Sequence, residues 1–169
     1  MSQTFFLIGF LILYGLAAFY FVWAMIFGVP FYPSNKKAIQ AIIDFLPKNK
    51  NLKVVELGAG DGRVAFAIAK LGYNVTAIEF NPFLSMIMRL RKVFGHYKNV
   101  EIKNVNFFSE ALNKYDIYVG YLFPKSMKKL DPILFTKENK GKTVISNTFA
   151  LKDRKPIKVN EKIYFYLID

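Results

Sequence analysis

The distribution of hydrophobic and polar residues divides the chain into two unequal parts. Residues 1–35 contain no charged side chain and no histidine, so all 24 basic and 12 acidic residues lie beyond them. The apolar run of residues 5–26 would form a helix of roughly 33 Å at about 1.5 Å per residue, long enough to cross a hydrocarbon core of about 30 Å. We therefore expect one transmembrane helix in an anchor of residues 1–29, contacting the bilayer through residues 5–27, and a separate domain of residues 30–169.

Two other interpretations of this apolar segment fit it less well. A cleaved signal peptide usually combines a basic first region with a shorter apolar core, and neither feature is present. A buried core helix of this length would rarely be apolar on every face. Basic residues follow the segment at Lys36, Lys37, Lys48, Lys50 and Lys53. By the positive-inside rule, they predict a single-pass membrane protein whose C-terminal domain lies on the cytoplasmic side.

Beyond the apolar segment, the hydrophobic pattern alternates between strands and helices. Short apolar runs predict strands at residues 53–57, 74–80, 100–105, 116–122, 143–147 and 162–168. Helical periodicity predicts helices at residues 35–46, 63–71 and 82–94. Ser34 and Asn81 are expected to cap the first and the third helix. Because strands alternate with helices, the predicted fold class is α/β, with a mostly parallel sheet and helices on both faces.

The composition limits the chemistry that the chain can perform. It has no cysteine and one histidine, His96, which is expected to be a solvated turn residue. Disulfides, thiolate zinc sites and a Cys nucleophile are therefore excluded, and no metal site is expected. The formal net charge of +12 would suit nucleic acid, anionic lipid headgroups or an acidic partner, and it does not choose among them. A solvated lysine-rich surface without any partner explains the charge equally well.

A glycine-rich turn follows the first predicted strand. Residues 54–63 read VVELGAGDGR, which places G-x-G-x-G between a strand and a helix. Glycines let the backbone approach a ligand closely. Glu56 and Asp61 would repel a pyrophosphate but attract a sulfonium and the ammonium of a methionine moiety, so S-adenosyl-L-methionine is expected in preference to NAD. The candidate cofactor-binding residues of this turn are Glu56, Gly58, Ala59, Gly60, Asp61, Gly62 and Arg63.

Further candidates follow the second and third predicted strands. Glu79 stands 23 residues after Glu56, at a strand end where an acid can accept hydrogen bonds from both ribose hydroxyls. After the third strand, the amide oxygen of Asn106 could accept a hydrogen bond from the adenine amino group, and Phe107 could pack on the ring. The alternative interpretations are a solvent-facing strand end at Glu79 and an ordinary polar turn at Asn106.

Taken together, these motifs resemble those of class I, seven-strand methyltransferases. ELGAGDGR is similar to their first motif, and Glu79 to their second. A narrower resemblance rests on the apolar helix, PFYPS at residues 30–34, VVELGAGDGRVAFAIAK, IEFNPFL and the C-terminal aromatic strand. This order resembles the lysine methyltransferases of the ATP synthase c subunit and the adenine nucleotide translocase, with their prokaryotic relatives. It implies a Rossmann-like sheet and methylation of a lysine side chain on a membrane-embedded protein substrate.

The resemblance also implies roles for individual segments. Residues 30–34 would lie over the cofactor or the substrate lysine, and Asn81 and Pro82 would extend the wall around the ribose and adenine. Phe80 and Asn81 are further candidate cofactor-binding residues. The family more often has Asp where this chain has Asn106. The short segment after the fifth strand leaves little room for a full sixth and seventh strand with their helix. The first candidate for orienting the lysine amine is Tyr121, and the second is Tyr32.

Three other functions compete with lysine methylation. Methylation of a lipid or quinone would also suit a membrane anchor. Nucleic-acid methylation would suit the net charge, but base methylation commonly uses an Asn/Asp-Pro-Pro-aromatic motif where this chain reads YLFP at residues 121–124. No nucleic-acid partner is therefore expected. A cofactor-binding membrane scaffold without activity is the non-enzymatic alternative.

Overall fold

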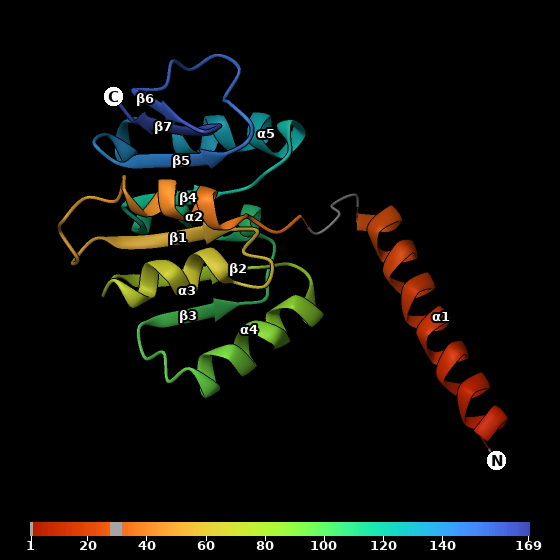
Figure 1. Cartoon of the computed structure of the whole chain (residues 1–169). Helices are drawn as coiled ribbons and strands as arrows, with labels where there is room; N and C mark the ends of the chain where they lie inside the picture. Colours follow the sequence, from red (N-terminus) through yellow and green to blue (C-terminus); the bar gives the residue numbers. More distant parts are fainter. Residues whose placement is uncertain (1, 28–31) are drawn as a thin grey trace. The chain divides into compact units, whose positions relative to one another are not determined.

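The computed structural model describes residues 2–27 and 32–169, which divide into two compact units, Met1–Tyr32 and Pro33–Asp169. The first unit contains the helix α1, Ser2–Phe27 (Figure 1). This helix carries no charged residue. Its window Gln3–Tyr20 has a mean hydropathy of 1.7 and is 0% buried. Length and composition make α1 a candidate membrane span, although a signal sequence would share both properties. The expected boundary between residues 29 and 30 lies outside the described residues.

The second unit is built on one seven-stranded sheet in the order β3-β2-β1-β4-β5-β7-β6. The first five strands pair in parallel, and β7 pairs antiparallel with both β5 and β6. The strands are β1 Lys53–Leu57, β2 Asn74–Ile78, β3 Val100–Lys103, β4 Ile117–Gly120, β5 Thr143–Asn147, β6 Lys158–Asn160 and β7 Ile163–Leu167. The predicted α/β class and mostly parallel sheet are confirmed.

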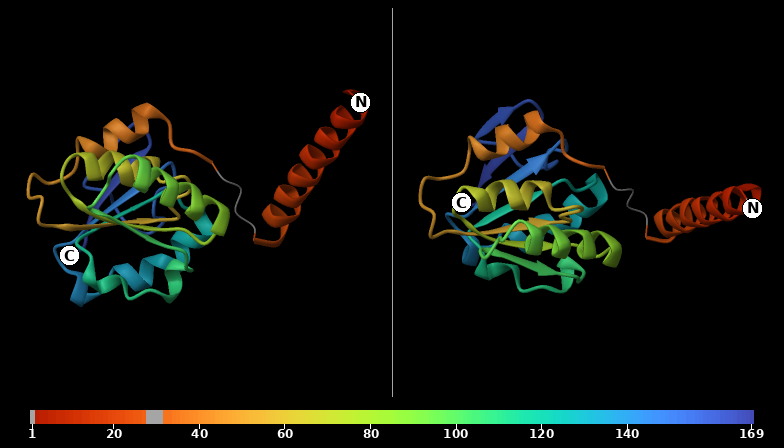
Figure 2. Two further views of the ribbon diagram at one scale, coloured as in Figure 1. Left: turned by 90° about the horizontal axis from the view of Figure 1, so that it is seen from below. Right: turned by 60° about the horizontal axis from the view of Figure 1, so that its bottom comes forward.

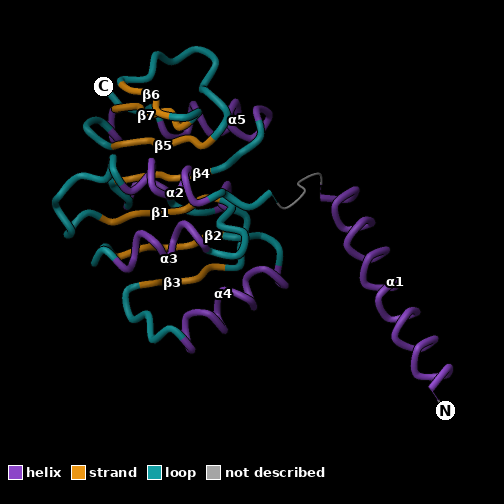
Figure 3. The backbone as a smooth tube through the Cα atoms, in the orientation of Figure 1, coloured by secondary structure: helices purple, strands orange, loops and turns teal. Residues whose placement is uncertain are grey.

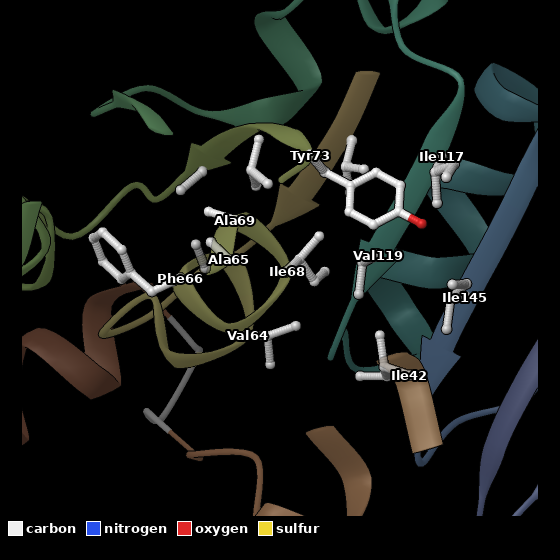
Figure 4. Packing of buried hydrophobic residues seen from close by; sticks show 14 of the residues in the cluster. Ile42, Val64, Ala65, Phe66, Ile68, Ala69, Tyr73, Ile117, Val119 and Ile145 are labelled. Atoms are coloured by element: carbon white, nitrogen blue, oxygen red, sulfur yellow. The ribbon is translucent and has the colours of Figure 1, made fainter. Parts of the chain in front are cut away.

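Helices cover both faces of this sheet (Figure 2). α2 Lys36–Ile43, α3 Arg63–Lys70 and α4 Pro82–Phe94 contribute to the core on one face, and α5 Pro124–Leu134 to the core on the other. Figure 4 shows Ile42 of α2 and Ile68 of α3 near the β4 residues Ile117 and Val119, all four of which are at most 2% exposed. The apolar stripes that predicted the helices α2 and α3 therefore do face the sheet.

Several predicted boundaries need correction. Asn35, not Ser34, caps α2, because its Oδ1 accepts a hydrogen bond from the Ala38 N–H at 2.9 Å. That helix ends at Ile43 rather than near residue 46. The strands β2, β3 and β4 are each shorter than predicted, because pairing with their neighbours ends where the chain turns into the loops at the sheet edge. Asn81 caps α4 as predicted.

The C-terminal region holds one strand more than predicted. β6 and β7 form a hairpin whose turn residues Glu161 and Lys162 have φ values of 47° and 68°. Residues 148–157, all of which are described, contain no helix, so a simple loop connects β5 to β6. The segment after β5 was expected to be too short for two further strands and their helix. Both strands are present, and residues 148–157 contain no helix. The helix α5 was not predicted, and its sequence PKSMKKLDPIL contains Pro132 inside the helix.

Gly62 provides a test of local packing at the start of α3. It has φ 77°, and a Cβ there would lie 2.8 Å from Met88 Cγ and from Phe66 Cε2. Gly62→Ala is expected to lower the free energy of unfolding by about 1–2 kcal/mol for the left-handed backbone and by about 1–3 kcal/mol more for overpacking. Gly141 is the matched control, since it has φ 82° but a Cβ there would meet no atom within 4 Å. Equal losses for Gly62→Ala and Gly141→Ala in urea unfolding would contradict the packing argument.

Candidate active site

The loops that follow the parallel strands share one edge of the sheet. Because β1 to β5 are parallel, their carboxyl ends lie on the same side, as the loops in Figure 3 show. β1 lies between β2 and β4, so the order of connections reverses between β1 and β4. Open α/β sheets bind ligands at such a reversal, outside the carboxyl ends of the strands. The predicted site residues from Glu56 onward lie on strands and loops that meet at this edge.

The glycine-rich loop, residues 58–62, is fixed mainly by backbone hydrogen bonds. The N–H groups of Gly58 and Ala59 both donate to the Ile78 carbonyl at 2.9 Å, and the Gly62 N–H donates to the Ala59 carbonyl at 2.8 Å. Gly58, Gly60 and Gly62 all have positive φ values, between 59° and 77°. The loop therefore adopts a conformation that L side chains rarely take, and its shape is set by the end of β2.

Glu79 joins the glycine-rich loop to the start of α4. One carboxylate oxygen accepts a hydrogen bond from the Gly60 N–H and the other from the Asn81 N–H, both at 2.8 Å. Each carboxylate oxygen has about two acceptor positions, so each can also accept a hydrogen bond from a ligand hydroxyl. The site thus offers a preorganised acid at the strand end where the sequence predicted a ribose contact.

Glu56, a predicted cofactor-binding residue, contacts the start of the helix α3. Its side chain is buried, and its Oε2 accepts a hydrogen bond from the Ala65 N–H at 2.8 Å. It thereby satisfies a free N–H of the first turn of α3, whose N-cap residue Gly62 has no side chain to do so. Burial raises the pKa of Glu56 well above its usual value, and the charges of Asp61 and Glu79 add to this effect against the Ala65 hydrogen bond.

Asp61 is paired with two arginines. The Arg63 guanidinium lies 2.9 Å and the Arg91 guanidinium 3.7 Å from the carboxylate of Asp61. Burial alone would raise the pKa of Asp61, but hydrogen bonds and charge from Arg63, with the charge of Arg91, lower it overall. Two guanidinium groups thus compensate the negative charge that was expected to attract a cationic ligand. Of the three acids, Glu79 is the one placed to act by accepting hydrogen bonds from a ligand.

Glu56 gives a prediction about the pH dependence of stability. The folded state keeps the Glu56 proton to a higher pH than the unfolded state, where a glutamate titrates near 4.5. The folded state therefore binds more protons above that pH, and this group lowers stability as the pH rises. Glu56→Gln stays neutral and keeps an oxygen for Ala65, so we expect a higher Tm at pH 7 and a smaller difference near pH 4.5.

Thermal unfolding of the ligand-free protein between pH 4.5 and 8 would measure this difference, with the exposed Glu138→Gln as the control. If Glu56→Gln unfolded at a lower temperature than the parent at pH 7, the prediction would be wrong, because the ionised side chain of Glu56 would then stabilise the folded state more than a neutral amide does.

The segment after β3 is held against the end of β2 by Asn104, which was not among the predicted site residues. The Asn104 side-chain amide donates to the carbonyl oxygens of Glu79 and Phe80, both at 2.9 Å. Asn106 caps a short 3-10 helix, η1 Phe107–Ser109, because its Oδ1 accepts a hydrogen bond from the Phe108 N–H at 3.0 Å. The turn interpretation thus holds for Asn106, and its contact with adenine stays a prediction, as does the packing of Phe107 on the ring. The role of Asn104 could have been suspected from the sequence, because it is a second side-chain amide two residues before Asn106.

Aromatic side chains line the carboxyl ends of β4 and β5. The ring of Phe149 lies 6.1 Å from that of Tyr121 and 5.7 Å from that of Phe123, measured between centroids. A Cβ on Gly58 would lie 3.2 Å from Leu122 Cδ2, so this segment abuts the glycine-rich loop. Phe149 could not be predicted as a site residue, because it follows a strand without any recognisable motif. Tyr32 belongs to the first unit, and its role stays a prediction.

A hydrogen-bonded chain connects the glycine-rich loop to the end of β5. The Arg63 guanidinium donates to the Ser34 carbonyl at 3.1 Å, in addition to its pairing with Asp61. The Asn147 side-chain amide donates to the Ser34 hydroxyl at 3.0 Å, and Ser34 is 9% exposed. Ser34, expected to cap a helix, instead holds the segment that precedes α2 across the sheet edge.

The fold and the site define a class I S-adenosylmethionine-dependent methyltransferase domain. The arrangement resembles the solved structure of an RNA methyltransferase from Salinibacter ruber in complex with S-adenosyl-L-homocysteine, with a TM-score of 0.74 and 26% identity over 81% of this chain and 94% of that one. The residues present fit this cofactor, because the glycine-rich loop has no Cβ at Gly58, Gly60 or Gly62 and Glu79 lies directly beside it. The chain belongs to the family of the ANTKMT methyltransferase domain, whose model matches residues 56–158.

Curated relatives carry related names. The lysine N-methyltransferase of the ATP synthase c subunit from Mus musculus is 26% identical over 72% of this chain, and this match covers 49% of the mouse protein. A protein-lysine N-methyltransferase of Saccharolobus islandicus is 25% identical over 83% of this chain and 94% of its own length. The chain therefore spans about half the length of the mouse relative but nearly all of the archaeal one.

Proposed function

We propose that the chain is an S-adenosylmethionine-dependent protein-lysine N-methyltransferase that acts on a membrane or membrane-proximal protein. The observation that carries this proposal is the junction of the glycine-rich loop with the aromatic segment after β4, where Leu122 approaches Gly58. A cofactor held by the loop would have its reactive end near Tyr121, Phe123 and Phe149. The names of the mouse and archaeal relatives support a lysine side chain as the acceptor.

The chain's own residues would position the two reactants. When bound, S-adenosylmethionine supplies a methyl group on a positively charged sulfur, which a neutral amine can attack in line. Glu79 would orient the ribose, and the fixed glycine-rich loop would hold the methionine end. Positioning of this kind can supply much of the rate acceleration, because the methyl donor is already activated. The aromatic side chains around Tyr121 would exclude water, which lowers the pKa of a lysine amine and favours its neutral form.

The membrane part of the proposal rests on α1. As a membrane anchor it would place the catalytic domain on the cytoplasmic side, according to the lysines that follow it. Such an anchor would confine enzyme and substrate to one bilayer and raise their effective concentration. Methylation of a lipid or quinone would benefit in the same way, and it is the first alternative.

The second alternative is nucleic-acid methylation. The net charge of +12 and the named activity of the Salinibacter protein favour it. The lysine-specific names of the curated relatives favour protein instead, and residues 121–124 lack the base-methylation motif. Incubating membranes from the source cell with the enzyme and labelled S-adenosylmethionine would separate the three. Label in a protein band that yields methyl-lysine on hydrolysis supports the proposal; label recovered in the lipid extract or in nucleic acid overturns it.

Tyr121 is the residue whose replacement tests the acceptor side. Tyr121→Phe keeps the ring beside Phe149 but removes the hydroxyl that would orient the amine. We expect kcat to fall by about 100-fold, at the lower end of the range for a positioned acid–base side chain, with the affinity for S-adenosylhomocysteine unchanged. Phe123→Leu is the matched control on the same segment, and it is expected to change kcat less. An unaltered kcat in Tyr121→Phe would assign the orienting role to another group.

A further inference from the structure

The helix α4 exposes a stripe of large apolar side chains. Phe83, Met86, Leu90, Val93 and Phe94 are between 49% and 79% exposed. Their spacing places them on one face of the helix, within an arc of roughly 100° at 3.6 residues per turn. The buried residues of α4 are Ser85 and Met88, which lie on the opposite side. The apolar stripe therefore points away from the core, the reverse of what an amphipathic surface helix normally shows.

The position of α4 leaves this stripe without a covering element of the same domain. In Figure 1, α4 lies at the end of the sheet formed by β3, with no further strand or helix of the domain beyond it. Within the domain, α4 packs mainly against β3, and its Arg91 lies over the ring of Phe66 in α3. Scattered exposed apolar residues are ordinary on protein surfaces, but a contiguous stripe on one helix marks an interaction site.

The charges around the stripe indicate what it contacts. Residues 80–100 contain no Asp or Glu and four basic residues, Arg89, Arg91, Lys92 and Lys98. At 100° per residue, Arg89 and Arg91 lie on opposite sides of the stripe. Helices that lie in a membrane interface combine an apolar face of Phe and Leu with flanking Lys and Arg, which contact anionic headgroups. An anionic lipid surface would repel acidic residues near the stripe, whereas most protein partners would tolerate them. The lack of acidic residues therefore favours a lipid surface.

Arg91 also connects this helix to the candidate active site. Its guanidinium donates to the Asp61 carbonyl at 3.0 Å and lies 3.7 Å from the Asp61 carboxylate. The helix α4 and the glycine-rich loop are thus joined by direct contacts of Arg91. A ligand surface that binds α4 would therefore also fix the position of the glycine-rich loop relative to that surface.

We propose that the exposed face of α4 docks on the anionic surface of a lipid bilayer. Its apolar side chains enter the boundary between headgroups and acyl chains, at a depth of about 5–10 Å. Arg89 of α4 and Lys98, four residues beyond its end, contact the headgroups. This inference does not depend on which molecule accepts the methyl group. It concerns a second contact with the membrane, on the methyltransferase domain itself and separate from α1.

A single reporter on α4 would test this docking directly. The chain has no native cysteine, so Val93→Cys in the full-length protein can be labelled with an environment-sensitive fluorophore. Ile157→Cys is the matched control, since the two parent side chains are 67% and 68% exposed. In vesicles with anionic lipid, we expect a blue shift of the label at position 93 and its quenching by lipids with a nitroxide high on the acyl chain. The label at position 157 should show neither effect.

The charge contribution is tested in the same background. Adding Arg89→Glu and Lys98→Glu to the Val93→Cys variant should reverse the blue shift, as should vesicles made only of zwitterionic lipid. Three outcomes would overturn the proposal: no shift in anionic vesicles, an equal shift at position 157, or a shift in detergent that grows with protein concentration and points to a second copy of the chain. Binding of S-adenosylhomocysteine, measured on the same samples, reports separately on the proposed function.

Discussion

Glu79→Gln is expected to weaken binding of S-adenosylhomocysteine by about 10–100-fold, the equivalent of one lost hydrogen bond to a charged group at about 1.5–3 kcal/mol. Both carboxylate oxygens of Glu79 accept backbone hydrogen bonds, one from Gly60 and one from Asn81. An amide has only one oxygen, so its NH₂ group would face one of these two N–H donors. The variant would disturb the glycine-rich loop and would also lose an acceptor for the ribose hydroxyls.

Calorimetric titration with S-adenosylhomocysteine measures this effect. Glu101→Gln is a suitable control, because Glu101 lies on the neighbouring strand β3 and its carboxyl is exposed. It removes the same charge and should leave the affinity unchanged. If Glu79→Gln bound the ligand as tightly as the parent, the assignment of the strand end as the ribose site would be wrong.

Removal of residues 1–28 is expected to reduce methylation of a membrane-embedded substrate by about 100-fold, while methylation of a short lysine peptide in solution is little changed. The reason is that an anchor makes the encounter with a membrane substrate effectively intramolecular, a gain of about 10²–10⁴-fold. The catalytic groups proposed above all lie beyond the deleted segment. Peptide activity therefore serves as the internal control that the shortened protein has folded.

Equal losses on both substrates would contradict the anchoring role of α1 and would show that this segment supports the domain itself. A substitution in the full-length chain gives an independent check. Leu11→Arg places a charge in the middle of the apolar window Gln3–Tyr20 and should reduce membrane retention. Lys37→Arg is the control, because it keeps the charge of a residue outside this window and should leave membrane retention unchanged.

Much of the architecture could be predicted from local patterns. β1 and β5 have the predicted bounds, and α4 begins and ends as predicted because Asn81 caps it, Pro82 follows and Gly95 ends it. These elements carry their signals within a few residues. By contrast, β6 was missed because it is short and polar and exists only by pairing with β7. α5 was missed because Pro132 lies inside it, and a proline at such a position normally predicts the end of a helix.

The candidate site shows the same division. The glycine motif and Glu79 could be recognised because each directly follows a strand that its own neighbouring residues predict. Phe149 and Asn147 could not, since each reaches the site from the end of β5 and has partners far away in the sequence, Tyr121 and Ser34. The electrostatic expectation for Asp61 was also incomplete, because Arg91 approaches it from α4. Pairing between distant residues decides which charges remain for a ligand.

By itself, the sequence determined the apolar segment, the alternation of strands and helices, and the glycine and acid motif of a methyltransferase domain. Each of these depends on the side chains of neighbouring residues and on the periodicity of helices and strands. Only the tertiary structure decided that Glu56 caps α3 from a buried position and that α4 turns its apolar stripe outward. Burial and long-range contacts depend on which elements cover which face of the sheet, and a local pattern does not specify that.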